Sequence, residues 1–384
     1  MHMHARLAPP VPRRGVYEIY WTFAARRHEA FERRVAGEPG PWTSDPILNT
    51  YKFCNVFRAA DRVSQYMIRS VAYADDAGSY ADRVFQIVAF RTFSNIATWE
   101  GVRAVLGGAP RLEDLTSGRF EQALDRVKAS NGGLYTGAFI LCANKAYGFD
   151  EKHRNHVALF KHMFGGGRLH EAVRGANSLE GIVRTLEGFP LMGPFMAYQT
   201  AVDLNYSDLL GFSEDDYTQA GPGALRGLRK AFHSLGDYTS SDAIQWMVEQ
   251  QDAEFERLGL AFRGLFGRRL HAIDCQGLFC ELDKYCREAV PELASNRSRI
   301  KARFTASSQK IELFFPPKWR LDLPSGSTVP PTICTAVAPQ IALELDAGRS
   351  REALEPDRRY SKRGPRRERA RGSDSDVTRP PMLL

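Results

Sequence analysis

The sequence predicts a mostly α-helical protein, on three observations. Apolar residues recur at three- and four-residue steps along much of the chain, and glycines and prolines bound these periodic segments. The strand–helix alternation of a parallel α/β sheet does not appear. With 384 residues, 43% of them hydrophobic, the chain can bury a large core. We expect a helical domain over residues 16–322, a disordered lead over 1–15 and a linker with a disordered Arg-rich tail over 323–384.

The first helix is expected over residues 17–35, because Tyr20, Ala24 and Phe31 share one helical face and the Gly- and Pro-rich segment 37–41 ends the pattern. A second helix should begin near Pro46, since capping oxygens precede it and proline loses no hydrogen bond at the first helical position. Further helical periods are predicted over 61–73, 81–93, 120–128, 153–164, 179–186, 194–204, 224–235, 241–258 and 270–287. Residues 302–315 are the main exception, because two β-prone runs around a Ser-Ser turn predict a short β-hairpin.

The basic charge of the chain is concentrated near its end. Residues 358–371 hold eight basic residues and one acidic residue, which accounts for the formal net charge of +7 and leaves the remainder near neutral. The basic excess is therefore a property of the tail, and any nucleic-acid binding by the helical domain must be argued from local patches.

Cysteine usage and hydropathy indicate the cellular compartment of the protein. The six cysteines include no Cys-x-x-Cys pair, which favours a reducing compartment, and we expect the cytoplasm. No apolar run reaches about 18 residues, so neither a membrane-spanning helix nor a membrane partner is expected. The spacing of His and Cys matches no structural zinc site, and no metal site is predicted.

Two glycine-containing segments precede predicted helices and are candidate phosphate-binding sites. Gly188 and Gly193 lie in a turn that is similar to a lengthened helix-hairpin-helix element, and Gly221 and Gly223 flank a proline before a helix that carries Arg226. The free N–H groups at a helix start favour a phosphate. For the first segment, a tight helical corner that needs positive φ is the favoured explanation, and for the second, a Pro-initiated helix with a solvated basic face explains the residues equally.

Several acids could do chemistry near such a phosphate. Asp216 precedes the Gly-Pro-Gly turn, and Asp283 and Lys284 lie on a predicted helix. A carboxylate there can act as general base, and a lysine can hold an anion. Helix caps and surface ion pairs explain the same residues without function. No segment reads Gly-x-x-x-x-Gly-Lys-Ser/Thr, so the chain shows no ATP-binding P-loop.

Four segments, taken together, resemble one protein family. They are Pro41-Trp42-Thr43-x-Asp45-Pro46-Ile47-Leu48, Tyr51-Lys52-Phe53-x-Asn55-Val56-Phe57-Arg58-x-x-Asp61-Arg62-Val63, Ala220-Gly221-Pro222-Gly223-Ala224 with Gly227, and Cys280-Glu281-Leu282-Asp283-Lys284-Tyr285. The chain resembles the helical domain of the 5-hydroxymethyluracil DNA kinases and the related alpha-glutamyl/putrescinyl thymine pyrophosphorylases, over about residues 17 to 320.

This resemblance implies an all-α fold similar to helix-hairpin-helix DNA glycosylases and a role in thymine hypermodification. In such pathways 5-hydroxymethyluracil in DNA is converted to a pyrophosphate ester, and an amine then displaces the pyrophosphate. The leading hypothesis is that this chain binds DNA and performs the displacement with an amine or amino-acid donor. The alternative is a non-catalytic DNA-binding module that works with a separate P-loop kinase. Base excision is the weakest reading, because Gly221-Pro222-Gly223 stands where glycosylases carry Asp.

The resemblance also assigns expected roles to residues. A flipped base would need an aromatic and polar pocket, with Trp42, Tyr51 and Asn55 as candidates. Pyrophosphate would lie at the Gly-Pro-Gly helix start near Arg58, Arg62, Arg226 or Lys284, and Asp61, Asp216 or Asp283 would take the amine proton. The cofactor is left open, with Mg²⁺ as the ion that a pyrophosphate substrate would bring. We expect Tyr51, Asn55, Arg58, Asp61 and Arg62 to form one wall opposite the Gly-Pro-Gly turn.

Overall fold

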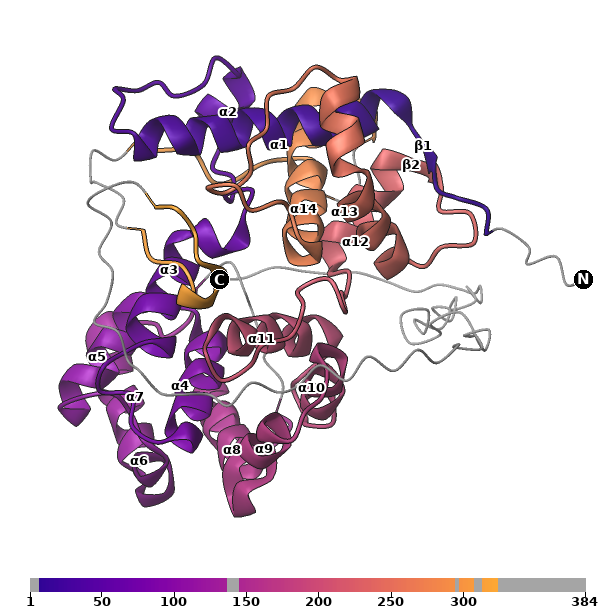
Figure 1. The fold of residues 1–384 in the computed structure, drawn as a ribbon. Helices are drawn as coiled ribbons and strands as arrows, with labels where there is room; N and C mark the ends of the chain where they lie inside the picture. Colours follow the sequence, from indigo (N-terminus) through magenta and orange to yellow (C-terminus); the bar gives the residue numbers. More distant parts are fainter. Residues whose placement is uncertain (1–6, 137–144, 294–296, 307–312, 324–384) are drawn as a thin grey trace, which may run out of the picture. The chain divides into compact units, whose positions relative to one another are not determined.

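The computed structural model describes residues 7–136, 145–293, 297–306 and 313–323, all within the first of two units, residues 1–330. As predicted, this unit is mostly helical (Figure 1). Its longer helices are α1 (Arg14–Val35), α4 (Tyr80–Phe93), α5 (Ile96–Leu106), α7 (Arg119–Asn131), α8 (Lys152–Phe164), α10 (Leu179–Glu187), α11 (Pro194–Tyr206), α12 (Pro222–Ala231), α13 (Ser240–Arg257) and α14 (Ala272–Ala289). Shorter ones are α2 (Pro46–Thr50), α3 (Arg62–Met67), α6 (Leu112–Ser117) and α9 (Arg168–Arg174).

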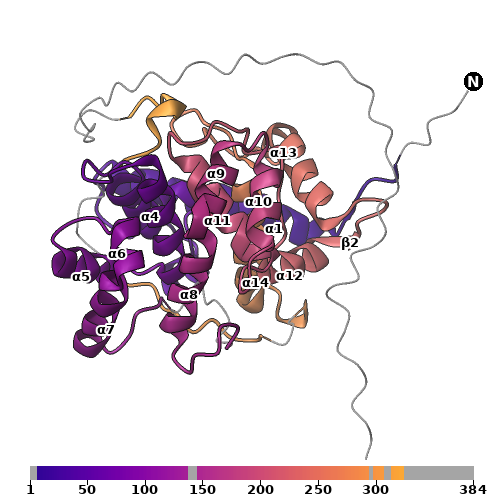
Figure 2. The same ribbon diagram turned by 90° about the horizontal axis from the view of Figure 1, so that it is seen from below.

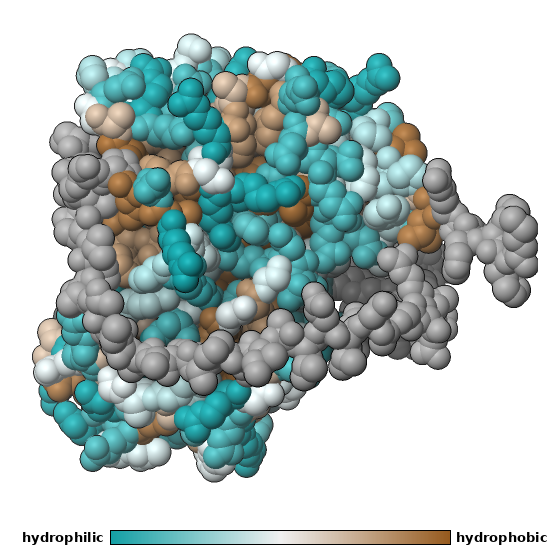
Figure 3. All heavy atoms as spheres, in the orientation of Figure 1, coloured by the Kyte–Doolittle hydropathy of each residue, from teal (hydrophilic) through white to brown (hydrophobic). Residues whose placement is uncertain are grey.

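The helices form two packed groups. α1, α12 and α13 pack around α14, while α4 contacts α6, α8, α9 and α11 (Figures 1 and 2). The segment before α3 joins the groups, because it contacts both α14 and α11. Hydrophilic side chains cover much of the surface in Figure 3, with apolar residues in smaller patches between them. The loop that precedes α3 is therefore held between the two groups.

Local signals explain where several helices begin. Asp45 Oδ1 accepts hydrogen bonds from the N–H groups of Ile47 and Leu48 at 2.9 and 3.0 Å, and Pro46 occupies the first turn of α2. Ser79 and Asp82 form a reciprocal capping box at the start of α4. The predicted start of α2 at Pro46 is confirmed, and so are helices in every segment where the sequence predicts one.

Close backbone approach defines the packing of α12 on α14. A Cβ added at Gly227 would lie 2.0 Å from the main-chain oxygen of Phe279, and one at Gly223 would lie 2.3 Å from Cys280 Sγ. A Cβ at Gly221 would lie 2.5 Å from the ring of Phe195, on α11. These glycines let helices approach more closely than any side chain would allow.

The strands differ from the expectation. β1 (Val11–Pro12) pairs antiparallel with β2 (Phe232–Ser234), and α12 therefore ends at Ala231 instead of continuing to residue 235. β1 lies within the segment that the sequence assigns to a disordered lead. The turn of the hairpin predicted over 302–315 lies outside the described residues, and Arg303 instead pairs with Tyr51. The predicted linker and tail also lie outside them, beyond residue 323.

Three helices were not predicted. α5, α6 and α9 lie between the predicted periods, and α9 follows a Gly triplet in which Gly166 and Gly167 adopt positive φ. α8 ends at Phe164, directly before the triplet, and the new helix α9 begins directly after it. Within the described part of the chain, no helix has both the length and the apolarity to cross a membrane.

Candidate functional site

Three parts of the chain that are distant in sequence meet on one face of α14. Glu281 Oε2 accepts a hydrogen bond of 3.0 Å from the N–H of Cys54 and lies 2.5 Å from Lys284 Nζ. Lys284 Nζ lies 4.6 Å from the centre of the Phe53 ring. Gly223, in the first turn of α12, packs on Cys280. We call this meeting point the α14 junction, formed by Cys54, Asp61, Gly223, Cys280, Glu281 and Lys284.

Asp61 is the most unusual acid of the α14 junction. It is partly exposed, and burial raises the pKa of its carboxyl to about 6, with the charge of Glu281 adding to the shift. The N–H of Asn55, which donates to Asp61 Oδ1 at 2.8 Å, and the guanidinium of Arg27 act in the opposite direction. A carboxyl group that titrates near pH 6 can both accept and release protons near neutral pH.

The two thiols at the α14 junction are not activated. Cys54 and Cys280 are exposed, yet the pKa of each lies above its ordinary value. The charge of Glu281 is the main cause at Cys54, and burial is the main cause at Cys280, whose pKa is raised to about 11. Both are therefore protonated near neutral pH and do not supply a thiolate nucleophile.

Arg58 faces inward from the loop before α3. Its Nη2 donates to Asp203 Oδ1 at 2.8 Å and its Nε donates to Gln199 Oε1 at 2.9 Å, while Arg91 Nε binds the second oxygen of Asp203. Asp203 is completely buried, and the Arg58 side chain is 10% exposed. This charge cluster ties the loop to α11 and α4.

Asp283 is surrounded by cations. Its Oδ2 accepts hydrogen bonds of 2.9 Å from Arg226 Nε and from Arg287 Nη2, and Lys230 Nζ lies 3.1 Å from Oδ1. Burial raises the pKa of this carboxyl, but the hydrogen bonds from Arg287, Arg226 and Lys230 outweigh burial and hold the pKa below its ordinary value. Asp283 is completely buried, so this placement accounts for both Asp283 and Arg226 as residues that fasten α12 to α14.

Comparison with known proteins identifies the family of the chain. The family described as "5-hmdU DNA kinase, helical domain" matches residues 14–295, which is well over half of the chain. The chain belongs to this family. A "5-hmdU DNA kinase" of Bacillus phage SP10 is 27% identical over 290 residues, covering 70% of this chain and 45% of that protein. The chain thus spans less than half the length of this relative. No solved structure matches it.

The first Gly-containing turn of this kinase-type helical domain differs from its sequence-based explanation. Gly188 and Gly193 have φ of −66° and −72°, and the positive φ falls on Leu191, at 69°. A need for positive φ therefore does not explain the glycines. Gly193 is exposed at the start of α11, and Phe195, two residues later, contacts Gly221 at the start of α12. The two Gly-Pro helix starts consequently lie next to each other, and phosphate binding there stays a prediction.

Asp216 lies apart from these contacts. It is exposed in the turn before Gly221, and within the described residues no side-chain hydrogen bond or ion pair involves it. Its neighbour Asp215 instead accepts from the N–H of Ala272 at 2.8 Å, and its other oxygen lies 2.8 Å from His271 Nδ1. Asp215 and His271 are 56 residues apart in the sequence, so their spacing does not predict this contact at the start of α14.

The predicted five-residue wall is not continuous in the helical domain. Asn55 and Asp61 are joined, but the Asn55 amide donates to Ala60 O at 2.7 Å and accepts from Arg27, so it holds the loop together. Arg58 faces the buried Asp203. Tyr51 pairs with Arg303, and Arg62 lies elsewhere. Three of the five residues, Tyr51, Asn55 and Arg58, contact residues that are distant in the sequence. Sequence spacing does not predict such contacts.

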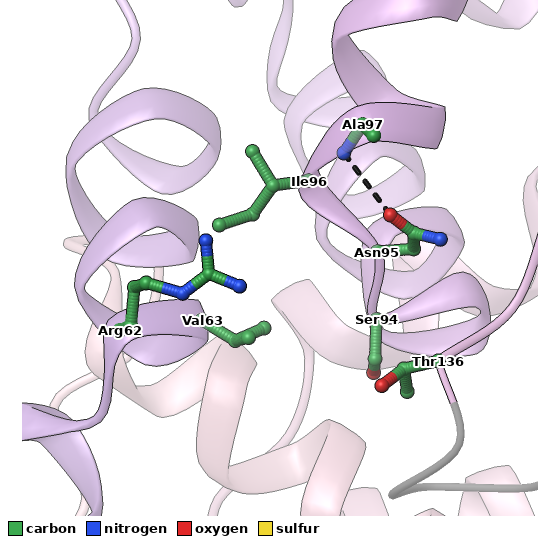
Figure 4. A pocket seen from close by; sticks show the side chains of 7 residues that line it. All are labelled: Arg62, Val63, Ser94, Asn95, Ile96, Ala97 and Thr136. Atoms are coloured by element: carbon green, nitrogen blue, oxygen red, sulfur yellow. Dashed lines mark hydrogen bonds between the residues drawn. The ribbon is translucent and has the colours of Figure 1, made fainter. Parts of the chain in front are cut away.

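Arg62 lines a separate hollow. The hollow has a volume of about 330 Å³ and is lined by Arg62, Val63, Ser94, Asn95, Ile96, Ala97 and Thr136. Figure 4 shows the Arg62 guanidinium extending from α3 toward Ile96 at the start of α5. Asn95 Oδ1 already accepts from the N–H of Ala97 at 3.0 Å, so the first turn of α5 is capped. This hollow shares none of the contacts of the α14 junction.

In the described residues, one cluster of side chains contains residue types that can bind a metal ion. His153 Nε2 lies 2.7 Å from Asp125 Oδ1 and 3.5 Å from Glu151 Oε2. Lys128 and Arg154 already pair with these carboxylates, at 2.6 Å for Lys128 and Glu151 and 3.6 Å for Arg154 and Asp125. The ion pairs account for the group without a metal ion.

Proposed function

We propose that this chain acts on modified bases in DNA and that the α14 junction displaces pyrophosphate from a pyrophosphorylated 5-hydroxymethyluracil with an amine. The observation that carries the proposal is Asp61, an acid of pKa about 6 beside exposed groups of α14. A base of this pKa is ionised at pH 7 and can accept the proton of an attacking amine. Membership in the DNA kinase helical-domain family supports DNA as the partner.

The proposed reaction is a nucleophilic substitution at the exocyclic methylene carbon of the base. The amine nitrogen forms a bond to this carbon while the bond from carbon to the pyrophosphate oxygen breaks. Pyrophosphate leaves with the bonding electrons, and Asp61 takes the surplus proton from nitrogen. Because the pyrophosphate charge must be neutralised as it leaves, cations and N–H groups near it lower the barrier.

The α14 junction offers such groups, and the charge of its Glu281 acts on Asp61. Lys284 is partly exposed at the α14 junction, and the first turn of α12, at Gly223, packs against the same face of α14. Glu281 already binds Lys284 Nζ at 2.5 Å and the N–H of Cys54 at 3.0 Å, and Asp61 is the proposed proton acceptor, so an Mg²⁺ ion would come with the pyrophosphate and not from a set of protein carboxylates. Such an ion would supply positive charge to the leaving group.

Not every predicted catalytic residue belongs in this step. Asp283 is completely buried and held by three cations, so it cannot reach an amine, and Arg58 is occupied by Asp203. Asp216 is exposed but has no contact with the α14 junction. The proposal therefore assigns the proton acceptor to Asp61 and the anion contact to Lys284, which also pairs with Glu281 but is 21% exposed, whereas Arg58 is 10% exposed and its partner Asp203 is completely buried.

A direct assay tests this function. Purified protein is incubated with pyrophosphorylated 5-hydroxymethyluracil DNA and a panel of amines and amino acids, and released pyrophosphate is measured. We expect release with at least one amine and loss of at least 100-fold in Asp61→Asn, on the scale of general-base catalysis. Asp216→Asn is the matched control and should keep its rate. No release with any amine would overturn the proposal.

A second candidate function rests on the comparison of lengths. The chain spans 45% of the phage kinase and its sequence shows no P-loop, so a non-catalytic module that presents DNA to a separate P-loop kinase would fit the same family. This candidate predicts salt-sensitive duplex binding that is unchanged in Asp61→Asn. It also predicts that adding the chain to such a kinase accelerates phosphate transfer to 5-hydroxymethyluracil DNA, which the displacement reaction does not require.

A further inference from the structure

Two segments about 250 residues apart form a small antiparallel ladder. Tyr51 pairs with Arg303, the N–H of Lys52 donates to Ala302 O at 3.0 Å, and the N–H of Phe304 donates to Thr50 O at 3.0 Å. These bonds place Lys52 directly beside residues 301–303. We call the side chains of Tyr51, Lys52, Lys301 and Arg303 the basic ladder.

Among the described residues, no acid pairs with the cations of the basic ladder. Lys52, Lys301 and Arg303 are exposed, and none of them forms an ion pair within the described residues. The acids that precede the ladder in sequence are engaged elsewhere: Glu38 pairs with Arg33 at 2.7 Å, and the buried Asp45 accepts from the hydroxyl of Tyr285 at 2.7 Å. The ladder therefore carries three positive charges that attract a polyanion, with Arg303 on the face of Tyr51 and Lys52 on the opposite face, because side chains alternate along paired strands.

An aromatic ring lies beside one cation of the basic ladder, and a second ring lies beside Arg34 nearby in the sequence. The Arg303 guanidinium lies 6.0 Å from the centre of the Tyr51 ring, and Arg34 lies 5.4 Å from that of Trp42. Trp42 is fixed by its indole N–H, which donates to Glu38 O at 2.7 Å, and it packs edge-on against Phe304 at 6.5 Å. A guanidinium held over a ring loses less freedom when it binds a phosphate.

We propose that the basic ladder binds the phosphodiester backbone of DNA next to the modified base. This inference rests on the proposed function, since it assumes that DNA is the substrate. Lys301 and Arg303 lie outside the family match over residues 14–295, so the comparison does not assign them a role. Tyr51 is only three positions from Cys54 at the α14 junction, a span of at most about 10 Å. A strand held by the ladder thus stays within reach of the junction.

Charge removal at two locations tests the ladder in the full chain. One variant carries Lys52→Gln, Lys301→Gln and Arg303→Gln. The control variant carries Arg14→Gln, Arg126→Gln and Arg168→Gln, three exposed arginines without ion pairs in the described residues. Both variants lose the same net charge and keep the Arg-rich tail. The dissociation constant for a duplex with one 5-hydroxymethyluracil is measured at several salt concentrations, and thermal unfolding verifies that both variants fold.

We expect the ladder variant to bind at least tenfold more weakly at 0.1 M salt. The slope of log K against log salt should fall by about 2 to 3, since each lost phosphate contact on duplex DNA contributes about 0.9. The control variant should change much less. Equal affinities and slopes for the two variants would contradict DNA binding by the basic ladder. Pyrophosphate release by the wild-type chain would still support the proposed function. A wild-type chain that binds no DNA would overturn both.

Discussion

Arg226, in the second turn of α12, donates a hydrogen bond of 2.9 Å to the completely buried carboxylate of Asp283, in α14. Lys230, one turn later on α12, contacts the same carboxylate, and Arg287 reaches it from α14 itself. One acid therefore compensates three cations at the contact of the two helices. Residues that suggest a substrate site in the sequence here hold the fold together.

Removing this carboxylate should destabilise the protein. Asp283→Asn leaves three cations without their counter-charge, and breaking a buried ion pair in this way costs about 3–5 kcal/mol. Denaturant unfolding measures the free energy. Asp216→Asn, at an exposed acid of the neighbouring turn, should change it by less than about 0.5 kcal/mol. Equal stability of the two variants would contradict the structural role of Asp283.

The raised pKa of Asp61 predicts a pH dependence of the reaction. Pyrophosphate release should increase as pH rises through about 6, where the Asp61 carboxyl ionises, and should level off above that pH. Asp61→Asn should abolish the increase because an amide cannot accept the amine proton. A rate profile that keeps its inflection near pH 6 in Asp61→Asn would assign that inflection to another group.

The same shift affects stability with a defined sign. Because the folded-state pKa of about 6 exceeds the ordinary value of 3.8, the folded protein binds more protons than the unfolded chain between these values. The contribution of Asp61 is therefore greatest below pH 4 and is lost as pH rises to about 6. Stability curves of wild type and Asp61→Asn, measured between pH 4 and pH 7, should converge at the acidic end.

A pair of glycine substitutions tests the packing of α12 on α14. Gly227→Ala places a Cβ 2.0 Å from the main-chain oxygen of Phe279, so the helices must separate, and we expect a loss of about 1–3 kcal/mol or more. Gly277→Ala, within α14, meets no atom within 4 Å and should stabilise the helix by about 0.5–1 kcal/mol. Melting temperatures that move in the same direction would refute the close-packing account.

The Arg-rich tail should contribute non-specific DNA affinity. Deleting residues 350–384 removes the eight basic residues of 358–371. Binding to unmodified duplex should weaken and depend less steeply on salt, while the unfolding temperature stays unchanged. Titrations at three salt concentrations measure this effect, and identical curves with and without the tail would count against it.

Local chemistry made much of the fold predictable. The start of α2 follows from Asp45 and Pro46 alone, and the apolar period over 17–35 predicts α1. The partners of functional candidates were not predictable in this way. Arg58 and Asp203 are 145 residues apart, and Arg226 and Asp283 are 57 apart, so no spacing rule relates them. A charged side chain looks the same in sequence whether it faces a ligand or a buried counter-charge.

Gly221 and Gly223, at the start of α12, show the same limit of prediction from sequence. In the sequence, Gly221 and Gly223 suggest an approach of backbone to phosphate, whereas their missing side chains admit Phe195 and Cys280. Both descriptions require the absence of a Cβ. Only the neighbours in the folded chain distinguish them, and these neighbours come from α11 and α14.

The approach of Gly227 to Phe279 has a consequence for how this family can diverge. Since main-chain atoms set the separation of α12 and α14, the helix start at Gly223 keeps its place on α14 when exposed side chains around it change. An exposed residue away from this contact, such as Cys54, can then be exchanged without shifting the frame, whereas Cys280 packs on Gly223 and cannot. The helix packing of α12 on α14 and the chemistry of the exposed loop at Cys54 can thus vary independently in this protein.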